Sequence, residues 1–395
     1  MTVFQGSAFG PSGDASALAD VISLFGAIGD YALEHKPGYH QRVAALAADI
    51  SQLAGVPSQD QDAVYIAGVM HAVGALGNGG LRKTDALPPR AAMMERWNIP
   101  AAGARICERI AALPKDTADI IRWHAENWDG TGYPDQLRWH GIPRCSQYLH
   151  IAEAFELTED PEEALTKLGA QAGRKFSPED VRTFVMWFHT TGGEIEARQF
   201  PLDALDAQKT SVDDVLRIIG EAIDAHNGTP HRGERIAQRA AAVAKALAAS
   251  ERDIGLTSAA ARLFGIGEMK LEDLEYHQFD PLAGLGRELR AQNAANSAGV
   301  LEGNATFADI VHILAARAEW FDGTGLPKHL RGDQIPLPAR ILAACIAHDA
   351  LDEMYRTQIR SDRAIPMDRI EQAAGTQFDP AVVRALADAV KAAPV

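Results

Sequence analysis

Four residues in the first half of the chain have side chains of the kinds that bind divalent metal ions. They are His40 in YHQRVAALAADI, His71 in VYIAGVMHAVGAL, His124 just before DGTGYP, and Glu153 in QYLHIAEAFEL. A histidine on the apolar side of a helix is more often a buried core residue than a ligand. Three imidazoles and one carboxylate are nevertheless enough to hold a single Mn, Fe, Zn or Ni ion. Such a site requires elements that bring the four segments together.

The elements that carry these residues occur twice in the chain. Residues 120–142, IIRWHAENWDGTGYPDQLRWHGI, recur in outline at 313–335 as ILAARAEWFDGTGLPKHLRGDQI, an offset of 193 residues. Further on, AGRKFSPEDV at 172–181 matches AGTQFDPAVV at 374–383. Because this period is far too long for a solenoid repeat, it predicts two complete domains of roughly 190 residues in tandem. We expect a short disordered tail at 1–16, a first domain at 17–204 and a second at 205–395.

The apolar pattern predicts an all-α fold for both domains. In stretches such as RVAALAADISQLA and ERIAQRAAAVAKALAA, apolar residues return at spacings of three and four, which is typical of amphipathic helices. Alternating apolar and polar runs, which would indicate strands, are scarce. The sequence therefore predicts two tandem helical bundles.

Composition excludes several classes of protein. The three cysteines form no CxxC spacing, so neither a disulfide framework nor a zinc–thiolate site is indicated. The formal net charge of −15 disfavours binding to DNA or RNA, whose affinity depends on clustered Lys and Arg. The N-terminus lacks a secretion signal, and no long apolar run indicates a membrane span. These features favour a cytoplasmic protein.

Motifs in the first domain match those of a known family. GVMHAVGAL corresponds to a helix that ends in an HD doublet, WHAENWDGTGYP to an HHE stretch ending in GYP, and GIPRCSQYLHIAEAFEL to the last site helix. Over nearly the whole chain, the sequence resembles the HD-GYP family, a branch of the HD metal-dependent phosphohydrolases. The resemblance implies a helical bundle that presents His and Asp to two or three metal ions, usually iron or manganese. It also implies hydrolysis of cyclic di-GMP or a related cyclic dinucleotide.

Carried over residue by residue, the resemblance assigns metal ligation to His40, His71, His124 and Glu153. It places His71 and His124 at the catalytic centre, with Asp129 there as a supporting or turn residue. The Asp of the HD doublet, however, is Ala72 here. Two cations roughly 3.5–4 Å apart need a bridging carboxylate to offset their repulsion. We therefore expect at most one divalent ion, Mn or Fe, with no ion as the alternative.

Other departures from the family pattern concern charge around the site. The family's Lys after the doublet is Ala75, its middle His corresponds to Trp97 or a near neighbour, and the second His of HHE is Ala125. Lys36 stands where three-metal members have Glu, and a cation there argues against a third ion. For substrate binding we expect Lys83 or Arg144 to supply the missing cation, with Arg82 as another candidate. The alternative is that these are ordinary solvated charges.

The second domain has lost the same site. At the common offset, His71 corresponds to Phe264, Ala72 to Gly265, His124 to Arg317 and Glu153 to Ile346. We expect no metal site there and a structural or regulatory role for this domain. The doublet His348-Asp349 corresponds to Phe155-Glu156, beyond the ligand position, and we expect it to be an ordinary pair on the helix surface.

The DGTGYP segment persists in both domains and has two interpretations. Glycines followed by proline suit a tight turn with positive φ, so Gly130, Gly132, Tyr133 and Pro134 can form a loop that shapes the bundle. In the family, this loop is associated with contacts to diguanylate cyclase domains. The resemblance therefore also implies a partner loop for a GGDEF-type signalling protein.

Two hypotheses of function remain open on the sequence. In the first, the chain is an HD-GYP-like phosphohydrolase for a cyclic dinucleotide such as cyclic di-GMP, with its one catalytic centre in the first domain. In the second, it is a pseudoenzyme: the first domain senses a nucleotide or metal, and the second supplies a homodimer or partner surface.

Overall fold

The computed structural model describes residues 14–77, 89–270, 282, 286–357 and 364–392. Over these ranges the chain is helical, and the only β-type pairings are two isolated bridges, Ala172 with Phe176 and Ala374 with Phe378. The all-α prediction is confirmed. Most of the expected N-terminal tail lies outside the described residues, but helix α1 already begins at Ala15, with Asp14 as its N-cap.

The described residues form two compact units, which divide between Val215 and Leu216. We call them the N-terminal unit and the C-terminal unit. The division lies eleven residues beyond the domain boundary expected from the sequence, because the connecting segment is bonded to the N-terminal unit. The backbone amide of Ala112 donates to the hydroxyl of Thr210 at 3.0 Å, and the amide of Asp206 donates to the carbonyl of Ala112 at 3.0 Å.

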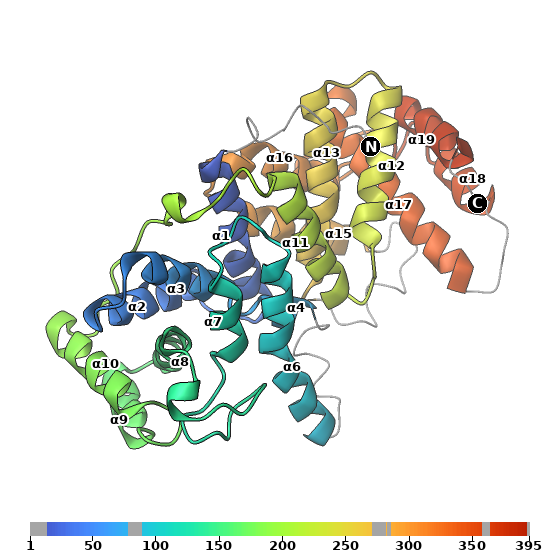
Figure 1. The fold of residues 1–395 in the computed structure, drawn as a ribbon. Coiled ribbons are helices and arrows are strands. Elements are labelled where there is room, and N and C mark those ends of the chain that lie inside the picture. The colour runs from blue at the N-terminus through green and yellow to red at the C-terminus, as the bar shows by residue number, and fades with distance from the viewer. Residues whose placement is uncertain (1–13, 78–88, 271–281, 283–285, 358–363, 393–395) are drawn as a thin grey trace. The chain divides into compact units, whose positions relative to one another are not determined.

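The N-terminal unit is built from helices that Figure 1 shows from blue to green. Helices α2, α3, α7 and α8 pack on one another, and α1 packs on α2, α3 and α4. The bounds are α1 Ala15–Ala32, α2 Tyr39–Leu53, α3 Ser58–Met70, α4 Val73–Gly77, α6 Pro89–Glu108, α7 Thr117–Trp123, η1 Trp139–Gly141, α8 Arg144–Glu156, α9 Pro161–Ala170, α10 Pro178–Thr191 and η2 Leu202–Ala204.

Close approach of α2 and α3 depends on a glycine. A Cβ atom at Gly68 of α3 would lie 2.5 Å from the Cα of Ala44 in α2, so only glycine allows the two backbones this separation. Alanine-rich faces on α2, from Ala44 to Ala48, are fully or almost fully buried. The small side chains of these helices thus draw together the elements that carry the candidate ligands.

The C-terminal unit repeats this helical arrangement, shown from yellow to red in Figure 1. Helix α12 packs on α13 and α17, as α2 packs on α3 and α8, and α13 also contacts α16. The bounds are α11 Val212–His226, α12 Arg232–Ala246, α13 Glu251–Leu263, η3 Phe264–Glu268, α15 Arg287–Leu301, η4 Ala305–Phe307, α16 Ala308–Ala316, η5 Gly332–Gln334, α17 Leu337–Thr357, α18 Ala364–Gln372 and α19 Pro380–Ala392.

The DGTGYP and DGTGLP loops have the same backbone construction. In each, a buried glutamate accepts two backbone amides: Glu126 from Asp135 and Leu137 at 2.6 and 3.1 Å, and Glu319 from Lys328 and Leu330 at 2.7 and 3.1 Å. Both loops also contain a cis peptide before the proline. This shared hydrogen bonding explains why Glu126 and Glu319 occupy matching positions in the repeat.

One described helix, α1, is long and apolar enough to cross a membrane by length and composition alone. Within the N-terminal unit, 67% of its apolar window is buried. Its residues Val21, Ile22 and Ile28 have no exposed surface. This degree of burial is typical of a core helix in a water-soluble domain.

Candidate metal centre

The four candidate ligands lie at the facing parts of four packed helices. His40 is in the first turn of α2, His71 is the residue at the C-cap of α3, His124 is at the C-cap of α7, and Glu153 is in the last turn of α8. All three histidines are at most 6% exposed. A Cβ atom at Gly29 would lie 2.8 Å from the imidazole of His40, so glycine in α1 leaves room for that ring. The fold brings the four predicted residues into one region.

Each imidazole is held by its Nδ1 atom. Nδ1 of His71 lies 2.7 Å from the carbonyl oxygen of Gly68, and Nδ1 of His124 lies 2.6 Å from that of Ile121. In both cases the ring turns back on the carbonyl three residues earlier, at a helix end where such carbonyls lack an intrahelical partner. Because a carbonyl only accepts, Nδ1 donates in both rings and Nε2 carries the lone pair.

His40 is oriented by a residue that the sequence interpretation missed. Asp30 of α1 is 5% exposed, and its carboxylate accepts from the backbone amides of Gly38 at 2.7 Å and His40 at 3.2 Å. The same carboxylate binds Nδ1 of the His40 ring. A signal was present in the sequence: Asp224 stands at the corresponding place in the second copy, and its carboxylate accepts from the amide of Gly233 at 2.8 Å.

The rings themselves are close neighbours. The ring centres of His40 and His71 are 4.7 Å apart, and those of His71 and His124 are 5.8 Å apart. Nε2 of His124 lies 4.0 Å from a carboxylate oxygen of Glu153. Nε2 of His40 is buried and has no hydrogen-bond partner among the described residues. We call His40, His71, His124 and Glu153 the histidine cluster.

The donor set of the histidine cluster fits a divalent cation in its chemistry. Three imidazoles hold Nδ1–H on an oxygen and keep the Nε2 lone pair available, which is how metal-ligating histidines are usually oriented by their neighbours. A buried lone pair with no donor opposite it, at His40, has the character of an unused ligand atom. As the side chains stand, no three His, Cys, Asp or Glu groups in the described ranges are close enough to hold one ion. Side-chain rotation must therefore accompany metal binding.

Electrostatics in the histidine cluster favour neutral imidazole and ionised carboxylate. Burial lowers the pKa of His71 to about 3, and His40 contributes in the same direction. Burial opposes ionisation of Glu153, but surrounding positive potential, from His124 first and Lys175 among the others, holds its pKa below the ordinary value. Neutral imidazoles and a carboxylate are the protonation states that bind metal.

Lys175 is the cation that the structure places near this site, and the sequence interpretation missed it. Burial lowers the pKa of its ammonium group, and the charge of Glu153 acts against that lowering. Its Nζ lies 5.2 Å from the centre of the Phe176 ring. Its carbonyl accepts from the amide of Trp128 at 3.0 Å, which joins the segment to the DGTGYP loop. The second copy has Gln377 at this position, so comparing the repeats could have singled it out.

The predicted substrate cations are placed differently. Arg144 lies 3.0 Å from Asp180 and 3.2 Å from Glu179, so its guanidinium ties α8 to the first turn of α10. Lys83 and Arg82 lie outside the described residues. Lys36 pairs with Glu159 at 3.4 Å, and both side chains are largely exposed.

Residues of the DGTGYP loop have structural contacts. The carboxylate of Asp129 accepts from the amide and hydroxyl of Thr131 at 3.0 and 2.6 Å, so the structure gives Asp129 the turn role. Gly130 has φ of 81°, and a Cβ atom at Gly132 would lie 2.1 Å from the amide of Asn127. Tyr133 precedes Pro134 through a cis peptide and stacks on Trp97. The expected contact with a partner stays a prediction.

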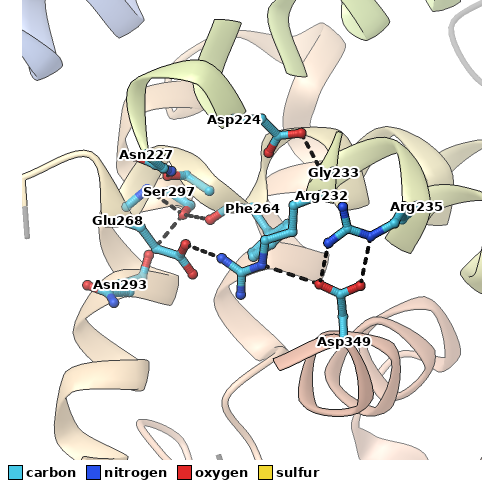
Figure 2. A network of polar contacts seen from close by, with 12 residues as sticks. Asp224, Asn227, Arg232, Gly233, Arg235, Phe264, Glu268, Asn293, Ser297 and Asp349 are labelled. Carbon is cyan, nitrogen blue, oxygen red and sulfur yellow. Dashed lines mark hydrogen bonds and ion pairs between the residues drawn. The ribbon is translucent and has the colours of Figure 1, made fainter. Parts of the chain in front are cut away.

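In the C-terminal unit an arginine–aromatic arrangement replaces the histidine cluster. The guanidinium carbons of Arg232 and Arg317 lie 4.9 and 5.7 Å from the centre of the Phe264 ring. Figure 2 shows the Arg232 side chain between Glu268 and Asp349, with nitrogen–oxygen distances of 2.7 and 3.6 Å. Two guanidinium groups beside the ring repel a divalent cation. This geometry supports the expectation that no catalytic metal binds here.

The surface location expected for His348-Asp349 is wrong. His348 is 4% exposed and Asp349 is 3% exposed. As Figure 2 shows, the Asp349 carboxylate receives Arg235 through two nitrogens, at 3.3 and 3.2 Å. Arg42 and Glu156 form the matching pair in the N-terminal unit at 2.6 Å. The doublet is therefore part of a buried ion-pair connection between helices, which the helical pattern alone did not distinguish from a surface pair.

Comparison with known proteins agrees with the repeat. A family model described as HD domain matches residues 30–179 and again residues 218–382. The crystal structure of a cyclic GMP-AMP specific phosphodiesterase from Vibrio cholerae has a TM-score of 0.68 to this chain. The match covers 95% of this chain and 98% of that one, at 19% sequence identity. At this identity, the likeness concerns the fold.

Curated relatives are cyclic-dinucleotide phosphodiesterases by name. The 3'3'-cGAMP-specific phosphodiesterase 3 of Vibrio cholerae is 27% identical over 288 residues, which cover 68% of this chain and 62% of that protein. The cyclic di-GMP phosphodiesterase of Thermotoga maritima is 25% identical over 180 residues, 42% of this chain and 49% of that protein. The matched part is thus less than two thirds of either relative. The chain belongs to the HD domain family and carries two copies of the domain, both degenerate versions of the HD-GYP type.

Proposed function

We propose that the N-terminal unit is a metal-dependent phosphodiesterase for a cyclic dinucleotide and that the C-terminal unit is not catalytic. The observation that carries this proposal is the common orientation of three buried imidazoles. Each holds Nδ1 on an oxygen acceptor, and Glu153 lies beside them. A core histidine needs no such neighbours, whereas a group of ligands does.

The residues would divide the work as follows. His40, His71, His124 and Glu153 would hold one ion, Mn or Fe, while Asp30 and the carbonyls of Gly68 and Ile121 keep the rings in their tautomers. When bound, a divalent ion lowers the pKa of a water molecule towards neutrality and polarises a phosphoryl oxygen. Ala72 supplies no bridging carboxylate, which supports a single ion.

Lys175 would take the part of the cation that Ala75 lacks. Its ammonium group is in electrostatic range of Glu153, so it can offset the negative charge of a phosphodiester bound at the histidine cluster. Arg144 is held by two carboxylates and is less suited to this role.

A cyclic dinucleotide is the proposed substrate class because the relatives are named for such substrates, 3'3'-cGAMP in one case and cyclic di-GMP in another. Their identities to this chain, 27% and 25%, do not distinguish between the two compounds. Both carry two purine bases and two phosphodiesters, and a centre of this kind acts on the phosphodiester.

The test is metal analysis of the purified full chain, combined with mass spectrometry of cyclic di-GMP and 3'3'-cGAMP incubated with Mn²⁺ or Fe²⁺. We expect slow, metal-dependent formation of a linear dinucleotide, its loss in His71→Ala, and tighter metal binding in Ala72→Asp. Phe264→Leu, the matched site in the C-terminal unit, should leave hydrolysis unchanged. Hydrolysis that survives in His71→Ala would place the activity elsewhere.

A second candidate function is a catalytically inactive regulatory module, as favoured by Ala72 and Ala125 in place of two family site residues. In this case the N-terminal unit would bind nucleotide or metal without turnover. Contact of residues 130–134 with a GGDEF-type protein, a homodimer and a cytoplasmic location belong to both versions of the proposal. Binding of cyclic di-GMP with no product in any metal would favour this second function.

A further inference from the structure

Two aromatic side chains lie on each other beside the histidine cluster. The rings of Trp97, in α6, and Tyr133, in the DGTGYP loop, have centres 6.1 Å apart and planes inclined by 14°. Both residues are half-buried, so part of each ring is accessible to solvent. An offset, nearly parallel pair of this kind presents flat apolar surface on which a further ring can stack.

The aromatic pair is within electrostatic range of a candidate ligand. Burial raises the pKa of the Tyr133 phenol, and the negative charge of Glu153 raises it further. Arg96, the neighbour of Trp97 in α6, acts in the opposite direction. Flat aromatic surface, a cationic side chain and the histidine cluster therefore occur together on one side of the N-terminal unit.

Holding the loop against the helix does not require an aromatic pair. In the C-terminal unit the corresponding residues are Arg290 and Leu326. There, Arg287 of α15 lies 5.6 Å from the centre of the Trp320 ring and donates to the carbonyl of Thr324 at 2.9 Å. The unit without the histidine cluster thus holds its loop by a cation, and the aromatic pair accompanies the unit that has the cluster.

We propose that Trp97 and Tyr133 form a stacking platform for a purine base of the nucleotide whose phosphodiester lies at the histidine cluster. This inference rests on the proposed function for the placing of the phosphodiester. Base–aromatic stacking tolerates different bases, because every base has a flat π face. The platform therefore selects nucleotides over simple phosphodiesters and accepts either guanine or adenine.

The experiment measures binding by the full chain without turnover. Isothermal titration calorimetry in EDTA, with cyclic di-GMP and separately with GMP and AMP, compares wild type with Trp97→Ala, Trp97→Phe and Trp320→Ala. We expect Trp97→Ala to weaken nucleotide affinity about 5- to 100-fold, the range for loss of one stacked base. Trp97→Phe keeps a ring and should recover most of the loss. Trp320→Ala, in the C-terminal unit, should bind as wild type does.

Separate readouts distinguish stacking from a structural role. Affinity for Mn²⁺ alone should be the same in all four proteins, and Tyr133→Leu, which introduces the residue found at Leu326, should weaken nucleotide binding without preventing folding. The platform is rejected if Trp97→Ala binds like wild type, if Trp97→Phe is as weak as Trp97→Ala, or if wild type binds no purine nucleotide. Trp97-dependent binding without hydrolysis in any metal would reject the proposed hydrolase and leave the platform standing.

Discussion

The carboxylate of Asp30 binds both the backbone amide and the ring Nδ1 of His40, which fixes the position and the tautomer of that histidine together. Asp30 comes from α1 and His40 from α2, so packing of the first two helices determines where the imidazole points. A carboxylate on Nδ1 also raises the basicity of Nε2, the atom that would meet a metal.

Replacing Asp30 by Asn should weaken metal binding. The amide can present its NH₂ to a ring nitrogen and no longer stabilises Nδ1–H, so affinity for Mn²⁺ should fall about 10- to 100-fold, as for other residues that orient a ligand. Calorimetric titration of the full chain with Mn²⁺ measures this. Asp224→Asn is the matched control in the C-terminal unit and should leave Mn²⁺ affinity unchanged; an equal loss in both variants would contradict the role of Asp30.

Lys175→Gln, which introduces the residue found at Gln377, should move two affinities in opposite directions. Removing a cation near Glu153 should tighten Mn²⁺ binding, because like charges repel. The same change should raise the KM for a cyclic dinucleotide, because one group that offsets phosphate charge is lost. The measurements are Mn²⁺ titration and steady-state kinetics. Lys175→Arg should remain near wild type, and a parallel loss of both affinities in Lys175→Gln would indicate a merely structural lysine.

Glu126 should be a stability residue. Its carboxylate accepts two backbone amides and is buried, so Glu126→Gln leaves an amide NH₂ facing a donor and should reduce the free energy of unfolding by about 1–3 kcal/mol. Glu319→Gln should cost a similar amount, because Glu319 makes the same two bonds. Urea denaturation measures both. If Glu126→Gln abolished hydrolysis with unchanged stability, Glu126 would instead act at the catalytic centre.

Asp224 predicts how the stability of the C-terminal unit depends on pH. Burial raises its pKa from 3.8 to about 7, while Gly233, Arg232 and Arg235 act in the opposite direction. Because the folded state then binds a proton that the unfolded chain releases, the stability contribution falls as pH rises from about 4 to about 7. Asp224→Asn, which resembles the protonated acid, should match wild type at pH 5 and be more stable at pH 8. A difference in unfolding free energy that is the same at both pH values would contradict this.

Much of the architecture could be predicted from the sequence because it depends on local pattern. The three- and four-residue spacing of apolar residues determines amphipathic helices, and the recurrence of 120–142 at 313–335 determines that the fold occurs twice. The loop glycines are required by the turn itself. The types of the candidate ligands, and the losses at Ala72, Phe264 and Ile346, are likewise visible in the residues alone.

Local pattern could not place the domain boundary or the burial of charged residues. The segment before Val215 follows the N-terminal unit because Thr210 and Asp206 bond to Ala112, a residue about a hundred positions earlier. Asp349 is buried because three arginines of α12 surround it, at 3.2 to 3.7 Å. Contacts between residues so far apart in sequence leave no periodic signal in either segment.

The sequence by itself thus determined that three histidines and a glutamate are available on helices of a repeated bundle. The tertiary structure decided which ring nitrogen each histidine presents, that Asp30 orients His40, and that Lys175 rather than Arg144 lies near Glu153. It also decided that two guanidiniums occupy the corresponding place around Phe264. The physical reason is that tautomers, pKa values and charge pairing depend on distances across helices, and those distances exist only after the helices have packed.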